Sequence, residues 1–272
     1  MQKINPFISI VIIFAFILNA CKTNVPVAEN IINNQEHLVL STLWFNESAE
    51  MQASFIQNYM LAKLMIDKHL SLQKESSKKP AVILDLDETV LDNVPYQYKL
   101  IATQKEYTFE SWTKWVNLAQ AKALPGVLDF TNYAKSKGVE VFYISNRQAP
   151  DHLDATIKNL QKLNFPNADK EHTFLRTTTS NKTERRNKVL EKHEIILLIG
   201  DNLTDFSEIF ANRGDDMGKK VVQKNKDLFG TKYIIMPNPM YGEWTKAIYK
   251  NSYKWTPGQL DSLRKAMIVP GY

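Results

Sequence analysis

The sequence has few of the residues that cross-link a protein or bind soft metals. It contains one cysteine, Cys21, so it cannot form an internal disulfide. Its five histidines are scattered, and without a Cys/His cluster nothing in the sequence supports haem ligation. There is no internal repeat and no low-complexity tract. A folded protein of this kind must rely on its hydrophobic core for stability.

Charge of a single sign is also missing from the sequence. The 34 Lys and Arg residues stand against 29 Asp and Glu, which gives a net charge of +5. No Lys/Arg run marks a nucleic-acid-binding tail, so we expect no nucleic-acid polymer as a partner. Hydrophobic residues make up 44% and charged residues 23%, as in ordinary globular proteins. The 272 residues are enough for one sizeable domain with an insertion.

The amino terminus has the pattern of a secretory signal. Lys3 gives a positive start, and residues 7–18 are almost wholly apolar. This apolar run is too short for a comfortable membrane span and suits a cleaved signal. We therefore expect residues 1–20 to be a signal peptide.

The residues that follow, Leu18-Asn19-Ala20-Cys21, resemble a bacterial lipobox. In such a sequence the cysteine becomes the lipidated first residue of the mature protein, for example with palmitate. Asn19 departs from the small or apolar residue usual at its position. We expect lipidation at Cys21, a polar tether over residues 21–36, and attachment to the membrane through the lipid anchor only. This predicts an exported bacterial lipoprotein of the outer membrane, cell surface or periplasm.

Beyond the tether, short apolar runs alternate with helical patterns. The runs that suit buried strands are residues 81–84, 139–144, 172–175, 195–199 and 233–236. The helical patterns between them cover residues 127–136, 151–163 and the segment that Lys182 opens. Strands that alternate with helices predict an α/β protein with a doubly wound parallel sheet.

Helices are expected on both flanks of this core and in one insertion. Apolar residues at three- and four-residue steps over 51–70 predict an amphipathic helix. Residues 94–124 are rich in aromatics and lack strand periodicity, so we expect a small helical cap insertion over the carboxyl edge of the sheet. The tail, residues 243–272, is helical at best, with Pro257 as a stop. The expected folded domain is 37–272.

Four of the predicted core elements begin or end with polar residues. These are Asp85, Asp87 and Thr89; Ser145 and Asn146; Lys182; and Asp201 with Asp205. In a parallel α/β sheet such ends converge on one crevice. Carboxylates as close as Asp85 and Asp87 repel each other unless a cation or a shared proton offsets the charge. For single residues simpler roles stay open: Ser145 could cap a helix and Lys182 could be solvated.

Five segments carry a resemblance to a known family: DLDETVLDN (85–93), YISNR (143–147), SNKTERR (180–186), GDNLTDF (200–206) and MPNPMYGEW (236–244). Their order and spacing resemble those of the haloacid dehalogenase-like (HAD) superfamily. Within it, the sequence is similar to the class C acid phosphatases, which include lipoprotein 5′-nucleotidases. The resemblance implies a HAD-like Rossmannoid core and an acid phosphatase activity on phosphomonoesters. It is also compatible with a homodimer.

The resemblance further implies roles for the residues at the strand ends. Mg²⁺ would be held by the Asp85 carboxylate, the Asp87 main-chain carbonyl and the Asp201 carboxylate, with Asp205 binding through water or orienting the others. Asp85 would be the nucleophile that forms an aspartyl-phosphate. Asp87 would be the general acid and then the general base, which requires it to carry a proton part of the time. Lys182 would stabilise the negative charge.

The substrate-binding residues implied by the resemblance are Ser145, Asn146, Tyr107 and Tyr241. Ser145 would hydrogen-bond a phosphoryl oxygen, and the two tyrosines would stack on a nucleobase or nicotinamide ring. That favours 5′-nucleotides or nicotinamide mononucleotide as substrates. Three alternatives stay open: tyrosines that only pack, a phosphatase for sugar phosphates or phosphopeptides, and a surface lipoprotein that binds a ligand such as haem with an idle site.

Overall fold

The computed structural model describes residues 35–72, 78–250, 252 and 254–271. The predicted signal peptide over residues 1–20, the lipidation site Cys21 and most of the tether over 21–36 lie outside the described residues. Within the described ranges, no helix combines the length and the apolarity needed to span a bilayer.

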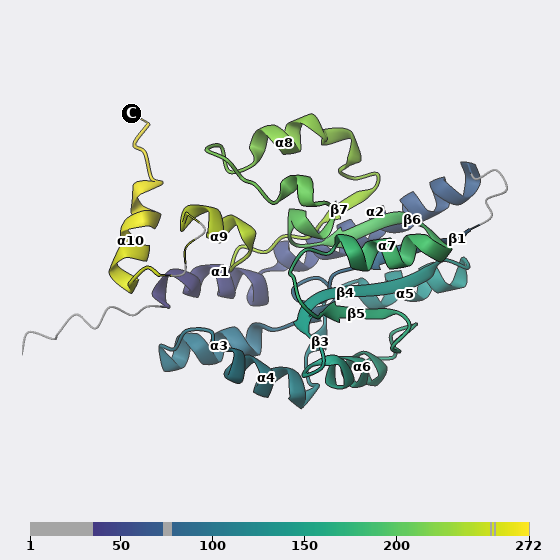
Figure 1. Cartoon of the computed structure of the whole chain (residues 1–272), viewed down its shortest axis with the longest axis horizontal. Helices are drawn as coiled ribbons and strands as arrows, with labels where there is room; N and C mark the ends of the chain where they lie inside the picture. Colours follow the sequence, from purple (N-terminus) through teal and green to yellow (C-terminus); the bar gives the residue numbers. More distant parts are fainter. Residues whose placement is uncertain (1–34, 73–77, 251, 253, 272) are drawn as a thin grey trace, which may run out of the picture. The chain divides into compact units, whose positions relative to one another are not determined.

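A parallel sheet forms the centre of the described chain (Figure 1). Its strands run in the order β5-β4-β1-β6-β7, with β1 in the middle, hydrogen-bonded to β4 and β6. Their bounds are β1 Lys79–Leu84, β4 Glu140–Gln148, β5 Thr173–Arg176, β6 His193–Gly200 and β7 Tyr233–Ile235. This topology confirms the predicted doubly wound α/β fold.

Side chains of β1 point alternately to two layers of helices. Val82 and Leu84 lie in one hydrophobic cluster, whereas Ala81 and Ile83 lie in a second. The first cluster includes residues of α2 (Ala49–Leu72), α5 (Val127–Ser136) and α6 (Leu153–Lys162), among other helices, and the second includes a residue of α7 (Thr183–Lys192). A strand covered on both faces must be apolar on both, which explains the unbroken apolar run that predicted it.

The strand β4 continues beyond its predicted end at residue 144. Its pairing with β5 extends through Ser145↔Leu175 to Gln148↔Arg176, with an irregularity between the two pairs. Ser145 therefore lies inside a strand, and the N-cap position of the helix that follows is occupied by His152. The interpretation of Ser145 as a helix cap is wrong, because the partner strand extends the ladder past the apolar run.

The predicted amino-terminal helical pattern forms two helices, α1 (Glu36–Glu47) and α2. They are separated at Ser48, whose backbone is extended with φ −81° and ψ 136°. The predicted apolar face of α2 is confirmed as core: its buried residues are Met51, Phe55, Tyr59, Ala62 and Ile66. The boundary between the helices carries no proline or glycine, which is why the sequence did not indicate it.

The segment between β1 and α5 is helical, as predicted. It contains α3 (Val94–Thr103) and α4 (Phe109–Leu118), which lie beyond one end of the sheet in Figure 1. Two very short strands, β2 (Leu91–Asp92) and β3 (Lys122–Ala123), pair antiparallel where this cap leaves and rejoins the core. Such short strands have no periodicity that a sequence could reveal.

The carboxyl-terminal part departs from prediction at Pro257. This residue is the first of α10 (Pro257–Ala266), after Thr256, whose side chain accepts a hydrogen bond from the Gln259 amide. Proline is well tolerated at a first helical position because its missing N–H needs no partner there. The expectation that Pro257 stops a helix is therefore wrong. The remaining elements are η1 (Leu203–Asp205), η2 (Glu208–Phe210), α8 (Lys219–Lys224), η3 (Lys226–Leu228) and α9 (Glu243–Ile248).

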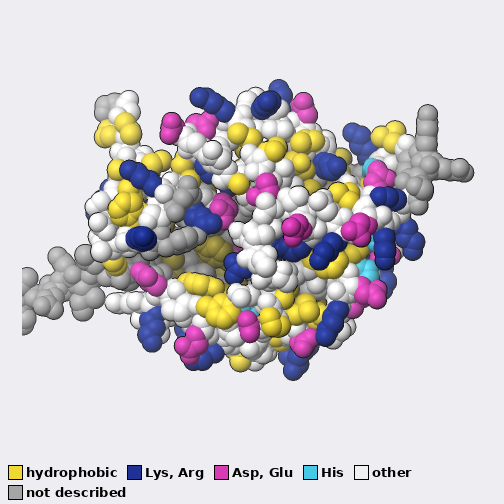
Figure 2. Space-filling view, in the orientation of Figure 1, with side chains coloured by type: hydrophobic (Ala, Val, Ile, Leu, Met, Phe, Trp, Pro, Cys, Tyr) yellow, Lys and Arg dark blue, Asp and Glu magenta, His cyan; other side chains and the backbone are white. Residues whose placement is uncertain are grey.

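The surface mixes charges of both signs. Figure 2 shows Lys and Arg side chains interspersed with Asp and Glu over the viewed face, with no broad basic field.

One buried hydrogen bond joins α2 to the loop after β1. The Tyr59 hydroxyl donates to the Thr89 main-chain carbonyl at 2.7 Å. Replacing Tyr59 by Phe leaves that buried carbonyl without this donor, so we expect Tyr59→Phe to lower the free energy of unfolding by about 1–3 kcal/mol in urea titrations. The control is Tyr133→Phe, which removes an exposed hydroxyl that donates to Asp67. Equal losses of unfolding free energy in the two variants would show that the buried hydrogen bond stabilises the fold no more than the exposed one does.

Candidate active site

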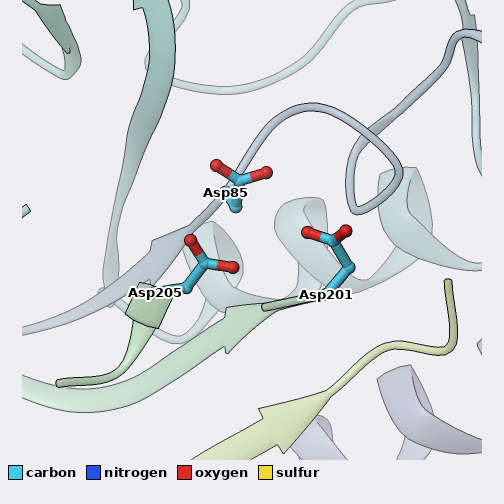
Figure 3. Close-up of side chains that lie close together, drawn as sticks. All are labelled: Asp85, Asp201 and Asp205. Carbon is cyan, nitrogen blue, oxygen red and sulfur yellow. The ribbon is translucent and has the colours of Figure 1, made fainter. Parts of the chain in front are cut away.

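Three aspartates, two of which directly follow neighbouring strands, meet at one edge of the sheet. Asp85 directly follows β1, Asp201 directly follows β6, and Asp205 ends η1. Each offers a carboxylate oxygen, and these oxygens lie within 4.8 Å of one another. Figure 3 shows the three side chains close together, with the carboxylates of Asp201 and Asp205 on the side of their backbones that faces Asp85. The structure thus brings together residues far apart in sequence, as the convergence of strand ends predicts.

Lys182 lies against this group of carboxylates. Its Nζ donates to Asp85 Oδ1, to Asp205 Oδ1 at 2.6 Å and to the Ile144 main-chain carbonyl at 2.7 Å. The residue is only 3% exposed, because it sits at the N-cap of α7, where that helix meets the sheet. The alternative that Lys182 is a solvated helix residue is therefore wrong.

Burial and mutual repulsion disturb the titration of these groups. Burial is the largest effect on Asp85 and raises its pKa to about 7, against the opposing charge of Lys182 and with added repulsion from Asp205. Burial, with repulsion from Asp205 and Asp85, also raises the pKa of Asp201 well above its usual range. Burial disfavours the charged Lys182, but Asp205 and Asp85 outweigh it, so its pKa is raised. A further cation would relieve the remaining repulsion between carboxylates.

The donor set fits a hard divalent cation. All three groups offer carboxylate oxygens, the ligands that Mg²⁺ prefers. Asp205 is the most engaged, because Oδ1 pairs with Lys182 and Oδ2 accepts the Asn202 amide at 2.9 Å. Asp201 accepts side-chain donors at Oδ2, from Asn202 at 2.9 Å and from Asn238 at 2.8 Å, and among the described residues no such donor reaches its Oδ1. The cluster thus suits Asp85 and Asp201 as direct ligands and Asp205 as a residue that orients them.

Gly200 is needed for the close approach of Asp205. A Cβ atom at position 200 would lie 2.3 Å from Asp205 Oδ2, far inside van der Waals contact. The glycine at the end of β6 is therefore a steric requirement for this carboxylate to pack under the site.

Asp87 lies beside the aspartate group and has its own partners. Its Oδ1 accepts from Arg147 Nη2 at 2.8 Å, Arg147 Nε at 2.9 Å and Asn93 Nδ2 at 2.9 Å. Ser145 Oγ lies 3.3 Å from Asp87 Oδ2 and accepts the Arg147 amide at 3.0 Å. Ser145 is fully buried, so in this arrangement its hydroxyl contacts the general-acid candidate.

A cavity of about 470 Å³ opens in front of these carboxylates. Asp85, Asp87, Lys182, Asp201 and Asp205 line its floor, together with Asn146, whose Oδ1 accepts from Arg185 at 2.8 Å. Its walls include aromatic side chains from the cap and from the segment after β7: Tyr96, Tyr107, Trp112, Tyr241 and Tyr249. All the predicted site residues except Ser145 and the undescribed Cys21 therefore line one cavity.

Sequence reasoning missed several residues of this site. Arg147 lines the cavity and pairs with Asp87, while Asn93, Asn202 and Asn238 orient carboxylates. Arg147, Asn93 and Asn238 all stand inside the quoted segments YISNR, DLDETVLDN and MPNPMYGEW. The signal was therefore present in the motifs, but only the fold shows which side chains in them face the carboxylates.

A parallel sheet that brings the carboxylates after β1 and β6 to one lysine beneath a helical cap defines a haloacid dehalogenase-like phosphohydrolase. The chain belongs to the HAD superfamily, subfamily IIIB (acid phosphatase), whose family model matches residues 14–244. This membership confirms the predicted family and places the chain among the enzymes of the acid phosphatase class.

Solved structures and curated sequences agree with this assignment. A class C acid phosphatase from Bacillus anthracis superposes with a TM-score of 0.82 and 41% identity, covering 88% of this chain and 99% of that chain. A tungstate-bound structure of the class C acid phosphatase from that organism gives 0.81 and 40%, covering 88% and 98%. Acid phosphatase 1 of Solanum lycopersicum is 26% identical over 70% of this chain and 73% of its own length.

Plant stem glycoproteins match over a shorter region. The stem 31 kDa glycoprotein of Glycine max is 28% identical over 62% of each chain, and the stem 28 kDa glycoprotein is 26% identical over 61% of each. The match thus spans less than two thirds of the length of these two relatives.

The raised pKa of Asp85 predicts how metal affinity depends on pH. Below the pKa of about 7 the carboxyl holds a proton that an incoming cation must displace. We expect the apparent Mg²⁺ affinity to rise with pH by up to about tenfold per pH unit for each proton displaced, including the range around pH 7 in which Asp85 loses its proton. Isothermal titration calorimetry in two buffers of different ionisation enthalpy measures both the affinity and the proton release. A pH-independent affinity without proton release would contradict the assignment.

Proposed function

We propose that the protein is an exported, lipid-anchored, Mg²⁺-dependent phosphatase that hydrolyses 5′-nucleotides or nicotinamide mononucleotide. The observation that carries the proposal is the gathering of Asp85, Asp201 and Asp205 in one cavity, where Lys182 pairs with Asp85 and Asp205. Carboxylate oxygens can hold a divalent cation, and this cation together with the fixed Lys182 ammonium can offset the charge of a bound phosphoryl group.

In the proposed reaction, an Asp85 carboxylate oxygen attacks phosphorus, and the bond from phosphorus to the leaving oxygen breaks. The resulting aspartyl-phosphate is hydrolysed by water, which regenerates the carboxylate and releases phosphate. Asp87 gives a proton to the leaving oxygen in the first half and takes one from water in the second. Lys182 offsets the negative charge that Asp85 and the phosphoryl oxygens share.

The cation is proposed to be held by Asp85 and Asp201 and by the main-chain carbonyl of Asp87, with Asp205 oriented by Lys182 and Asn202. When bound, it would neutralise the phosphate and keep it in line with the nucleophile. Oxygen ligands and the absence of thiolate favour Mg²⁺ over softer metals.

The aromatic walls of the cavity support a substrate that carries a planar ring. Tyr107 is 57% exposed, and its ring lies 6.3 Å from that of Trp112, which in turn lies 5.1 Å from Tyr96. Tyr241 lines the cavity from the segment after β7. An exposed tyrosine at a cavity mouth, backed by other rings, offers a free face for stacking on a base.

Two alternatives differ in what they require of the site. A phosphatase for sugar phosphates or phosphopeptides would use the same floor but not the aromatic walls. A haem-binding lipoprotein would need histidine, cysteine, methionine or tyrosine ligands. Among the described residues, the group able to hold a metal consists of carboxylates, which favours the phosphatase.

The proposed location follows from the amino terminus. A signal peptide over residues 1–20 and lipidation at Cys21 would tether the domain through residues 21–36 to the outer membrane or cell surface. A homodimer is compatible with the family resemblance and is proposed on that basis alone.

The nucleophile assignment predicts that Asp85→Asn abolishes phosphate release, because the amide cannot form the aspartyl-phosphate. We expect a loss of at least about 10⁴-fold in kcat. Asp129→Asn is the matched control, since this exposed aspartate pairs with Lys63 away from the cavity. Circular dichroism verifies that both variants fold. Substantial turnover by Asp85→Asn would show that Asp85 is not the nucleophile.

The aromatic walls predict a preference for ring-bearing substrates. In assays with Mg²⁺ across acid to neutral pH, kcat/KM should be higher for 5′-nucleotides and nicotinamide mononucleotide than for sugar phosphates. Tyr107→Ala and Tyr241→Ala should each lower kcat/KM for the ring-bearing substrates by an amount that corresponds to the loss of about 1–3 kcal/mol of stacking free energy. The kcat/KM for sugar phosphates should stay unchanged. Phe variants at both positions are the controls and should retain the preference. Equal losses on both substrate classes would favour the sugar phosphate alternative.

A further inference from the structure

The carboxylate of Asp87 is held by two side chains on one of its oxygens. Arg147 Nη2 and Nε and Asn93 Nδ2 all approach Oδ1, at 2.8, 2.9 and 2.9 Å. The contacts to Oδ2, from Arg147 Nε and Ser145 Oγ, are both longer, at 3.3 Å. The two oxygens of Asp87 are therefore unequal: Oδ1 is fixed by donors, and Oδ2 is the less engaged one.

Asn93 can make these contacts in one orientation only. It is fully buried, and its Oδ1 accepts from Trp115 Nε1 at 2.8 Å and from Arg147 Nη2 at 3.4 Å. Indole and guanidinium groups are donors without acceptors, so the amide oxygen must face them and the amide nitrogen must face Asp87. Trp115 belongs to α4 of the cap. One buried amide thus links the cap to Asp87.

Arg147 is held as firmly as Asn93. It is 3% exposed, its Nη1 donates to Thr156 Oγ1 at 3.1 Å, and its guanidinium lies 5.7 Å from the centre of the Trp112 ring. Trp112 also belongs to α4. A buried guanidinium needs hydrogen-bond acceptors, and Asp87 Oδ1 remains an acceptor for Arg147 whether or not Oδ2 carries a proton. Core and cap therefore hold Arg147 together, and Arg147 in turn holds Asp87.

We propose that Arg147 and Asn93 are positioning residues for proton delivery by Asp87, and that the Trp115 N–H makes their alignment depend on the cap. This inference rests on the proposed role of Asp87 as general acid. Fixing Oδ1 leaves Oδ2 to carry the proton toward the leaving oxygen, and one rotamer of the side chain is selected in advance. The bond from phosphorus to the leaving oxygen breaks as that oxygen takes the proton from Oδ2.

Leaving-group dependence separates this role from a general structural one. The substrates are phenyl phosphate and 4-nitrophenyl phosphate, which have similar size and shape. Phenolate is the poorer leaving group and needs a proton, whereas 4-nitrophenolate departs more readily without one. Since kcat/KM covers the steps through departure of the phenol, a defect in proton delivery must lower it more for phenyl phosphate.

The variants are Arg147→Lys, which keeps the charge but loses the planar fork, and Trp115→Phe, which removes one N–H and keeps the ring. Asp87→Asn is the reference variant, and its kcat/KM should fall by about 10²–10⁴-fold for phenyl phosphate and by much less for 4-nitrophenyl phosphate. We expect Arg147→Lys and Trp115→Phe to lower kcat/KM about tenfold more for phenyl phosphate than for 4-nitrophenyl phosphate. Trp255→Phe is the matched control, because its indole N–H donates to the Tyr249 carbonyl and not toward Asp87; it should affect both substrates equally.

The outcomes distinguish this inference from the proposed function. One outcome is that Asp87→Asn shows the leaving-group effect while both positioning variants lower kcat/KM equally for the two substrates. In that case the positioning role is overturned, and the assignment of Asp87 as general acid stands. If Asp87→Asn itself lowers kcat/KM equally for both substrates, the assignment of Asp87 as general acid fails, and the inference fails with it. Arg147→Lys could fold poorly, and in that case the result for Trp115→Phe against Trp255→Phe decides.

Discussion

The repulsion among buried carboxylates is the constraint on which the site depends. Asp85 and Asp205 are each 8% exposed, and they share the edge of the sheet with Asp201. Burial raises the pKa of Asp85, and the Lys182 ammonium, which also pairs with Asp205, counters this effect on Asp85. Asp201 accepts hydrogen bonds from the side-chain amides of Asn202 and Asn238, where Asp85 and Asp205 have the Lys182 ammonium. Ionisation of all three carboxylates together therefore requires further positive charge, which a bound divalent cation can supply.

The fold supplies this arrangement through a few backbone features. Adjacent parallel strands β1 and β6 end side by side, so Asp85 and Asp201 must be neighbours once the strands pair. Gly200 leaves room for Asp205, and the N-terminus of α7 brings Lys182 between them. The cap then adds aromatic walls and the link through Trp115 to Asn93 and Asp87. Each element contributes one side of the same cavity.

Much of the fold was predictable because its strands are buried on both faces. The apolar run of β1 and the helix α5 appear in the sequence as they do in the structure. The extension of β4 past Ser145 and the pairing of β2 with β3 were not predictable, since they depend on partner strands and not on local composition. Pro257 was misread because a proline that begins a helix and one that ends a helix look alike without the preceding cap.

The site was predictable to the extent that its residues end strands. Asp85, Asp201 and Lys182 follow from topology and from the family resemblance. Arg147 and Asn93 do not, because their importance comes from side-chain contacts across the cap boundary. Ser145 shows the opposite case, since a residue expected to touch the substrate is fully buried and contacts Asp87 instead. Motifs thus identify the residue types of a site, and packing decides their roles.

The central claim is that Asp85 and Asp201 jointly hold one divalent ion at the floor of the cavity. Crystals grown with Mn²⁺ in place of Mg²⁺ would test it directly by anomalous diffraction. The account predicts a single strong anomalous peak in contact with carboxylate oxygens of both aspartates. A peak bound elsewhere, or no peak at this point in crystals soaked with saturating Mn²⁺, would contradict it.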